Sequence, residues 1–201
     1  MRHRRCWIQG IAIAGLFACL PLGAQAETAR WEIDPDHSLI EFRVAHMVIS
    51  KTSGRFTDYH GFVEMDADAK TFKTIEATIN AESINTNHEK RDGHLRNADF
   101  LEVKQFPTMT YKMKSSQKEG ESYKVLGNLT LRGVTKEVVL IGTFNGATKD
   151  PWGNTRAGFT ADGKLNRKDF GMVWNKTLDT GGLVVGDEVQ IHLDIECIKG
   201  K

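Results

Sequence analysis

The side chains of this sequence with the clearest chemical potential are a few histidines and arginines. His46 ends a run of alternating residues, where its imidazole could donate a hydrogen bond to the polar end of a ligand. Arg91, His94 and Arg96 lie in one polar segment, and Arg167 lies in another. If the two segments meet, these side chains could bind a diphosphate or a polar ring. The alternative is that His46 bonds a neighbouring backbone group and that Arg96 and Arg167 tie loops to the fold.

The spacing of the histidines does not predict a metal centre. His88 and His94 are six residues apart, which does not place two imidazoles on one face of a helix. The sequence contains no His-x-x-x-His or Cys-x-x-Cys pair. A scattered site built on His37, His46 or His60 is left open, but we expect no metal.

The segment Asp36-His37-Ser38 has the composition of a catalytic triad without its geometry. Neighbours in a turn and strand point in different directions, so their side chains cannot converge on one reacting atom. The sequence also has no Gly-x-Ser-x-Gly elbow and no phosphate-binding glycine loop. We therefore expect no catalytic residues.

The elements that must position these residues are β-strands, because most of the chain from Ile40 to Ile198 alternates apolar and polar residues. Side chains of a strand point alternately to opposite faces, so this pattern makes one apolar and one polar face. Eight stretches show it, around residues 40–46, 54–65, 75–81, 107–113, 125–131, 138–144, 157–165 and 189–198. The second has a predicted bulge near residues 59–61. The sixth is also apolar at Val139 and Ile141, which predicts a covered outer face.

The alternation stops near Thr86. Thr86 and Glu89 have capping-box spacing, and the polar stretch that runs to Asp99 has Leu95 and Ala98 as its apolar points. We expect a short exposed helix in this segment, which would form a flap or rim on the strand framework.

Eight strands joined mainly by short turns predict an all-β protein, an extended eight-stranded antiparallel barrel with a short helix. Such a barrel is just wide enough to be packed solid or to hold one slim ligand. Its inner phase mixes small residues, such as Ala77, Gly127 and Gly142, with aromatic residues such as Phe42 and Phe159. Small residues leave room and aromatic rings make apolar walls, a combination that suits a long, narrow tunnel for a linear lipid. Interdigitation of these side chains into a solid core fits the alternation equally well.

The N-terminal segment predicts export. A basic start is followed by an apolar run and by Ala24-Gln25-Ala26, which fits the small-x-small cleavage pattern. We expect residues 1–26 to be a signal peptide and residues 27–201 to be one domain. Lipidation of Cys19 is the alternative.

The predicted mature chain is nearly neutral. Without Arg2, Arg4 and Arg5 it has 24 basic and 26 acidic side chains, which argues against a nucleic-acid partner. Cys197 is then the single cysteine, and its place on the apolar phase of the last strand predicts a buried, unreactive thiol.

Several motifs follow one another in a specific order and spacing. They are Asp36-His37-Ser38 before Ile40, Phe42, Val44 and His46; Gly54-x-Phe56; Asp92-Gly93-His94-Leu95-Arg96 with Asp99-Phe100; Phe106-Pro107; the run from Gly127 to Lys136; the run from Asn166 to Gly171; and the run from Val185 to Val189. Together they resemble the YceI family of exported, lipocalin-like proteins that bind polyisoprenoid lipids. The resemblance runs nearly end to end. It implies a lipocalin-like barrel that holds an isoprenoid chain, such as a quinone or its precursor, with no enzymatic activity and no cofactor besides that lipid.

This resemblance, together with the strand phase, predicts the ligand site. The expected tunnel-lining residues are Phe42, Val44, His46, Phe56, Ile79, Leu95, Met109, Tyr111, Leu129, Phe144, Phe159 and Ile191. The head-group candidates are Arg91, His94, Arg96 and Arg167. The expected function is periplasmic binding, storage or transport of the lipid.

Two alternatives to an isoprenoid carrier are left open. One is an enzyme that acts on a lipid or quinone, with His46 or Tyr111 as an acid or base. The other is a stress-response or interaction protein with a solid barrel. A carrier could also dock on a membrane redox protein, and the apolar outer residues Val139 and Ile141 allow a homodimer.

Overall fold

The alternating segments form eleven β-strands in this structure, a computed structural model that describes residues 28–179 and 181–200. The strands are β1 (Ala29–Ile33), β2 (Leu39–His46), β3 (Ser50–Phe56), β4 (Tyr59–Asp66), β5 (Thr71–Asn80), β6 (Ile84–Asn85), β7 (Thr108–Glu119), β8 (Ser122–Leu131), β9 (Val134–Lys149), β10 (Thr155–Asn166) and β11 (Val185–Lys199). The helices are η1 (Ala81–Ser83), α1 (Glu89–Arg96) and η2 (Arg167–Phe170). The predicted signal peptide and Cys19 lie outside the described residues. None of the helices in the described ranges has the length and apolarity needed to cross a membrane.

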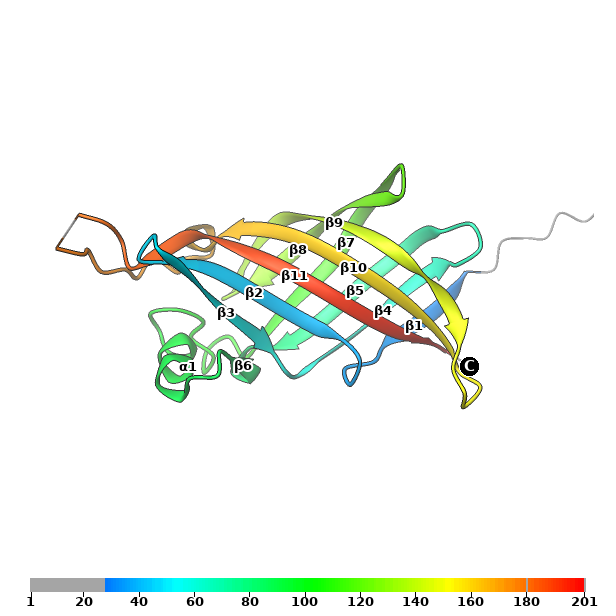
Figure 1. Ribbon diagram of the computed structural model, residues 1–201, viewed down its shortest axis with the longest axis horizontal. Helices are drawn as coiled ribbons and strands as arrows, with labels where there is room; N and C mark the ends of the chain where they lie inside the picture. Colours follow the sequence, from blue (N-terminus) through cyan, green and yellow to red (C-terminus); the bar gives the residue numbers. More distant parts are fainter. Residues whose placement is uncertain (1–27, 180, 201) are drawn as a thin grey trace, which may run out of the picture.

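Interruptions divide three of the barrel's eight strands into two pieces each. The first strand consists of β1 and β2, the second of β3 and β4, and the third of β5 and β6. The first and second strands pair through β2 with β3 and through β1 with β4. The second and third pair through β3 with β6 and through β4 with β5. The order then runs β5-β7-β8-β9-β10-β11, and β11 closes the ring by pairing with both β1 and β2. The prediction of an eight-stranded antiparallel barrel with a short helix is confirmed (Figure 1).

The second predicted strand is interrupted rather than bulged. The amide of Thr57 donates to the carbonyl oxygen of Ser83 at 3.3 Å, and Asn80 donates to the carbonyl oxygen of Asp58 at 2.9 Å. These bonds to the turn around η1 take Thr57 and Asp58 out of the strand ladder. The chain rejoins the barrel at Tyr59 and pairs there regularly with β5, so the bulge predicted at residues 59–61 is wrong.

The helix is present, but Thr86 does not cap it. His88 is the N-cap residue, and its Nδ1 accepts from the amide of Arg91 at 3.3 Å. Thr86 instead directs its amide, at 3.0 Å, and its hydroxyl to the buried carboxylate of Asp92. Leu95 packs on the apolar core. The helix is therefore attached to one end of the barrel (Figure 1) and is not exposed on all sides.

The smaller of two apolar clusters closes one end of the barrel. Trp31, Met65 and Cys197 are almost fully buried there, so the predicted burial of Cys197 is confirmed. On the outer wall, Val139 and Ile141 are 37% and 47% exposed. The predicted cover over this face is absent from the described part of the chain, because β9 forms part of a single-layered barrel wall.

Candidate ligand-binding cavity

A cavity of about 300 Å³ lies inside the barrel, a volume at the lower end of the range for small-molecule sites. The residues of β11 that line it lie an even number of positions apart, so they share one face of the strand. They are Val185, Val189, Ile191, Leu193 and Ile195. At about 3.3 Å per residue, the stretch from Val185 to Ile195 spans roughly 33 Å. The barrel is therefore not packed solid, and its hollow is long and narrow.

Most of the tunnel positions predicted from strand phase lie at this wall. The lining includes Phe42, Val44, Phe56, Ile79, Leu95, Met109, Tyr111, Leu129, Phe159 and Ile191. The same inward phase, repeated on neighbouring strands, brings these side chains together. Their contact with a ligand stays a prediction.

His46 and Phe144 do not line the cavity. His46 is the last residue of β2 and pairs with Val185 of β11. The register between these strands shifts between Val185 and Val189, the partner of Val44. Val44 is therefore the last residue of β2 that faces the hollow. Phe144 keeps the inner phase, but its ring packs against that of Phe159 with centroids 5.4 Å apart. Phe159 faces the hollow, and Phe144 fills space behind it.

The cavity wall offers few groups for acid–base chemistry. The hydroxyl of Tyr111 donates to the carbonyl oxygen of Val125 at 3.4 Å, and burial raises the pKa of Tyr111 to about 12. A group with a pKa so far above neutrality is a poor general acid or base. The other residue of the enzymatic alternative, His46, does not line the cavity.

Arg167 reaches the cavity wall, but its donors are already used. The side chain is only 3% exposed. Its partners are the carbonyl oxygens of Met172, Trp174, Val185 and Gly186 and the carboxylate of Asp187. Burial lowers the pKa of Arg167, while Asp187 opposes this shift. A guanidinium has five N–H groups, so Arg167 joins two ends of a loop and retains no free donor for a head group.

The other two arginines are also tied to backbone carbonyls. Arg96 donates to the carbonyl oxygens of Glu82 and Ile84, both at 2.8 Å. Arg91 donates to the hydroxyl and the carbonyl oxygen of Thr86 at 2.7 and 2.8 Å. These contacts hold the segment around η1, β6 and α1 in place. The geometry therefore favours the loop-tying role over the head-group role for the predicted arginines.

His94 joins α1 to the loop that follows η2. Its Nε2 lies 2.7 Å from Oδ2 of Asp99. The imidazole packs edge-on against Phe100 and Trp174, with centroids 5.0 and 4.8 Å away. Phe100 also lines the cavity. The sequence identified Phe100 only as part of a motif. Its apolar side chain in a polar segment is the signal that could have identified it as a lining residue.

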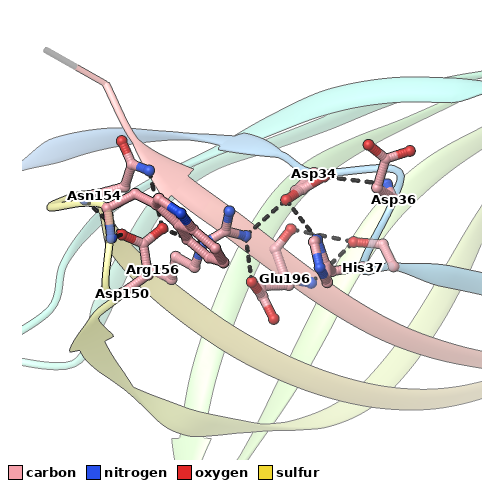
Figure 2. A network of polar contacts seen from close by, with 9 residues as sticks. Asp34, Asp36, His37, Asp150, Asn154, Arg156 and Glu196 are labelled. Carbon is pink, nitrogen blue, oxygen red and sulfur yellow. Dashed lines mark hydrogen bonds and ion pairs between the residues drawn. The ribbon is translucent and has the colours of Figure 1, made fainter.

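A polar network around Arg156 lies at the opposite end of the barrel (Figure 2). Arg156 donates to Asp150 at 2.8 Å, to Asp34 at 2.7 Å and to Glu196 at 2.5 Å. Burial by itself raises the pKa of Asp34, but hydrogen bonds from Arg156 and His37 hold it below its usual value. The Arg156 hydrogen bond likewise lowers the pKa of Asp150. The network ties two turns to β11.

Three members of this network have the spacing of a metal site. Ligand atoms of Asp34, His37 and Glu196 lie within 4.8 Å of one another. Arg156 donates to both carboxylates (Figure 2), so a permanent positive charge already stands where a cation would be held. The structural role accounts for the arrangement, and the absence of a metal stays a prediction.

Comparison with known proteins agrees with this architecture. The model of the YceI-like domain matches residues 31–197. "Protein YceI" of Salmonella newport (strain SL254) is 40% identical over 178 residues, which are 88% of this chain and 90% of that protein. The crystal structure of the Campylobacter jejuni YCEI protein has a TM-score of 0.68 and 32% identity, and covers 78% of this chain and 90% of that one. A polyisoprenoid binding domain from Saccharophagus degradans is 14% identical, with a TM-score of 0.65 over 87% of this chain and 100% of that domain, which shows a shared fold. With its barrel, its ordered motifs and these relatives, the chain belongs to the YceI-like family.

Proposed function

We propose that this protein binds a polyisoprenoid lipid inside the barrel and stores or carries it in the periplasm. The observation that carries the proposal is the long, narrow cavity with its aliphatic and aromatic wall. Each methylene transferred from water to such a wall contributes about 0.8 kcal/mol. A few isoprene units are therefore enough for binding without a charged anchor.

Two further observations support a binding protein rather than an enzyme. The arginines near the cavity donate to protein groups, so affinity would come from the hydrocarbon chain more than from the head group. The fold is shared with a protein described as a polyisoprenoid binding domain. A quinone or its precursor is the specific ligand that we expect, without a separate cofactor. Delivery to a membrane redox protein and formation of a homodimer are finer parts of the same proposal, as is export by cleavage after Ala26.

The direct test is to identify what the protein carries. Protein purified from its host is extracted with organic solvent, and the extract is analysed by mass spectrometry. We expect a prenyl lipid in about molar proportion to the protein. Delipidated protein should then bind an added prenylquinone. No prenyl lipid in the extract, together with no binding of the quinone, would contradict the proposal.

A matched pair of variants separates the cavity from the outer wall. Ala161 lines the cavity on β10, so Ala161→Phe places a ring where the lipid would lie. Val139→Phe places a ring on the exposed outer face of β9. We expect the first variant to weaken quinone binding about tenfold or more and the second to leave it unchanged. Equal affinities in two folded variants would place the ligand elsewhere.

A further inference from the structure

The hairpin between β2 and β3 holds two strongly exposed apolar side chains. Val48 is 81% exposed and Ile49 is 82% exposed. The φ angle of Val48 is 65°, in the left-handed region that β-branched residues disfavour and glycine or asparagine usually occupies. Val48 thus combines backbone strain with an exposed aliphatic side chain. The backbone cost comes from the tight turn, in which Met47 also has a positive φ of 51°.

The loop after η2 brings a further exposed apolar side chain to the same place. Leu183 is 43% exposed. A methyl group built on Gly182 would lie 4.0 Å from Cγ2 of Val48, so the loop and the hairpin are in direct proximity. Both extend from the same end of the barrel, to the left in Figure 1. We name this group of three residues the apolar tip: Val48, Ile49 and Leu183.

The apolar tip adjoins one end of the cavity. Val44 and Val185 are lining residues, and just beyond them the amide of Met47 donates to the carbonyl oxygen of Val184 at 2.9 Å. This bond joins the hairpin to the loop next to the hollow. The far end of the barrel is closed by the buried cluster around Trp31. A ligand that enters along the barrel axis would therefore pass the apolar tip.

Two lysines flank the apolar tip. Lys51 lies on β3, two residues after Ile49, and donates to the neutral side chain of Gln190 at 3.0 Å. The carbonyl oxygen of Lys176 accepts a hydrogen bond from the amide of Val184, which is next to Leu183. Neither ammonium group pairs with a carboxylate in the part of the chain that the structure describes. Unpaired lysines beside exposed aliphatic side chains match anionic head groups above hydrocarbon.

We propose that the apolar tip inserts into the surface of an anionic lipid bilayer and docks this end of the barrel on the membrane. The inference rests on the proposed function, since it supplies the route by which a lipid would enter the cavity. A bilayer deforms around separate protruding side chains. A stable protein partner would instead need a complementary surface of about 800 Å², which protruding loop ends do not offer.

The test measures flotation of the protein with lipid vesicles. The chain is used from Glu27 onward, so that the N-terminal segment contributes nothing to binding. Vesicles contain phosphatidylethanolamine with phosphatidylglycerol, or phosphatidylcholine alone. We expect binding to the anionic vesicles, weaker binding to the neutral ones, and a loss of about tenfold or more in the double variant Val48→Asp/Ile49→Asp. The matched control, Val139→Asp/Ile141→Asp, carries the same charges on the outer wall and should bind like the unmodified protein.

A fluorescence measurement locates the contact. Cys197 is fully buried, so Ile49→Cys introduces an accessible thiol for an environment-sensitive dye. The dye should shift to the blue when anionic vesicles are added, whereas a dye at Ile141→Cys should not shift. The inference would be overturned if the unmodified protein did not bind anionic vesicles, or if the two double variants bound them equally. It would also be overturned if gel filtration showed a dimer that the tip variant disrupts, because a second copy would then cover the tip.

Failure of this inference can be distinguished from failure of the proposed function. Quinone binding by the delipidated protein is measured without vesicles, so it does not depend on docking. Quinone binding without vesicle binding contradicts the membrane inference and leaves the cavity proposal standing. Vesicle binding without quinone binding contradicts the cavity proposal and, with it, the suggested entry of the lipid at the tip.

Discussion

The aromatic ring of Tyr111 on β7 lies directly against the backbone of Gly127 on β8. A Cβ atom built on Gly127 would lie only 2.7 Å from Cε2 of Tyr111. Tyr111 is 8% exposed and lines the cavity. The sequence suggested that Gly127 leaves empty space in the barrel, but the space is filled. The missing side chain makes room for the tyrosine ring, and this contact determines where the cavity wall stands.

Gly127→Ala should destabilise the barrel by about 1–3 kcal/mol, because the added methyl group must displace a packed ring. The measurement is the free energy of unfolding in urea. Gly93→Ala is the matched control, since nothing lies within 4 Å of its added Cβ in α1. An alanine inside a helix should instead stabilise by about 0.5–1 kcal/mol. A neutral effect of Gly127→Ala would show that the ring of Tyr111 moves freely.

Arg167→Lys should lower the free energy of unfolding by about 2–3 kcal/mol, because one ammonium group cannot serve the carbonyl oxygens that the guanidinium holds and leaves buried acceptors unpaired. Amide hydrogen exchange should increase at Met172, Trp174 and Val185 in the variant. Lys168→Ala is the control, because Lys168 is exposed and, among the described residues, its ammonium pairs with Asp187 alone. Reduced quinone affinity with unchanged stability and exchange would instead assign Arg167 to the head group.

The Arg156 network should make the fold sensitive to acid. The pKa values of Asp34 and Asp150 lie below their ordinary value of 3.8. Each carboxylate therefore stabilises the fold fully above the pKa of the unfolded chain, and this contribution is lost as the pH falls through the lower folded pKa. We expect the urea midpoint to decrease as the pH is lowered from about 5 to below 3.

Asp150→Asn should lower the urea midpoint at neutral pH, because the ion pair with Arg156 is lost. It should also make the midpoint less dependent on pH, because the variant has no carboxylate at this position to protonate. Asp36→Asn serves as the control, because the carboxylate of Asp36 makes no ion pair in the described part of the chain. Equal acid dependence in the unmodified protein and Asp150→Asn would contradict the role assigned to this carboxylate.

Cys197 should react with thiol reagents only after unfolding. The side chain is fully buried, and burial raises the pKa of its thiol to about 12. The thiolate is the reactive form, so iodoacetamide should label the native protein negligibly at pH 8 and label it fully in urea. Rapid labelling of the native protein would show that β11 opens at this end of the barrel.

Local geometry explains which features could be predicted from the sequence. In a strand, the face of each residue follows from covalent geometry alone, so alternation identified Phe42, Ile79 and Met109 as inward-facing before any pairing was known. The closed barrel followed because each strand has an apolar face that must be buried. The break at Thr57 could not be predicted in this way, because the hydrogen bonds that cause it come from η1, more than twenty residues away.

The roles of the polar residues were decided by tertiary structure. The sequence showed that Arg156, Arg167 and Asp34 are charged, but their partners are brought together only when the barrel closes. Whether a guanidinium binds a ligand or a carbonyl oxygen depends on which acceptors lie within about 3 Å. For the same reason, strand register and side-chain packing decided that His46 and Phe144 do not line the cavity. The sequence by itself determined which residues face inward. Only the folded chain decided which of them border the hollow, because alternation is a property of neighbouring residues whereas a cavity depends on contacts between distant ones.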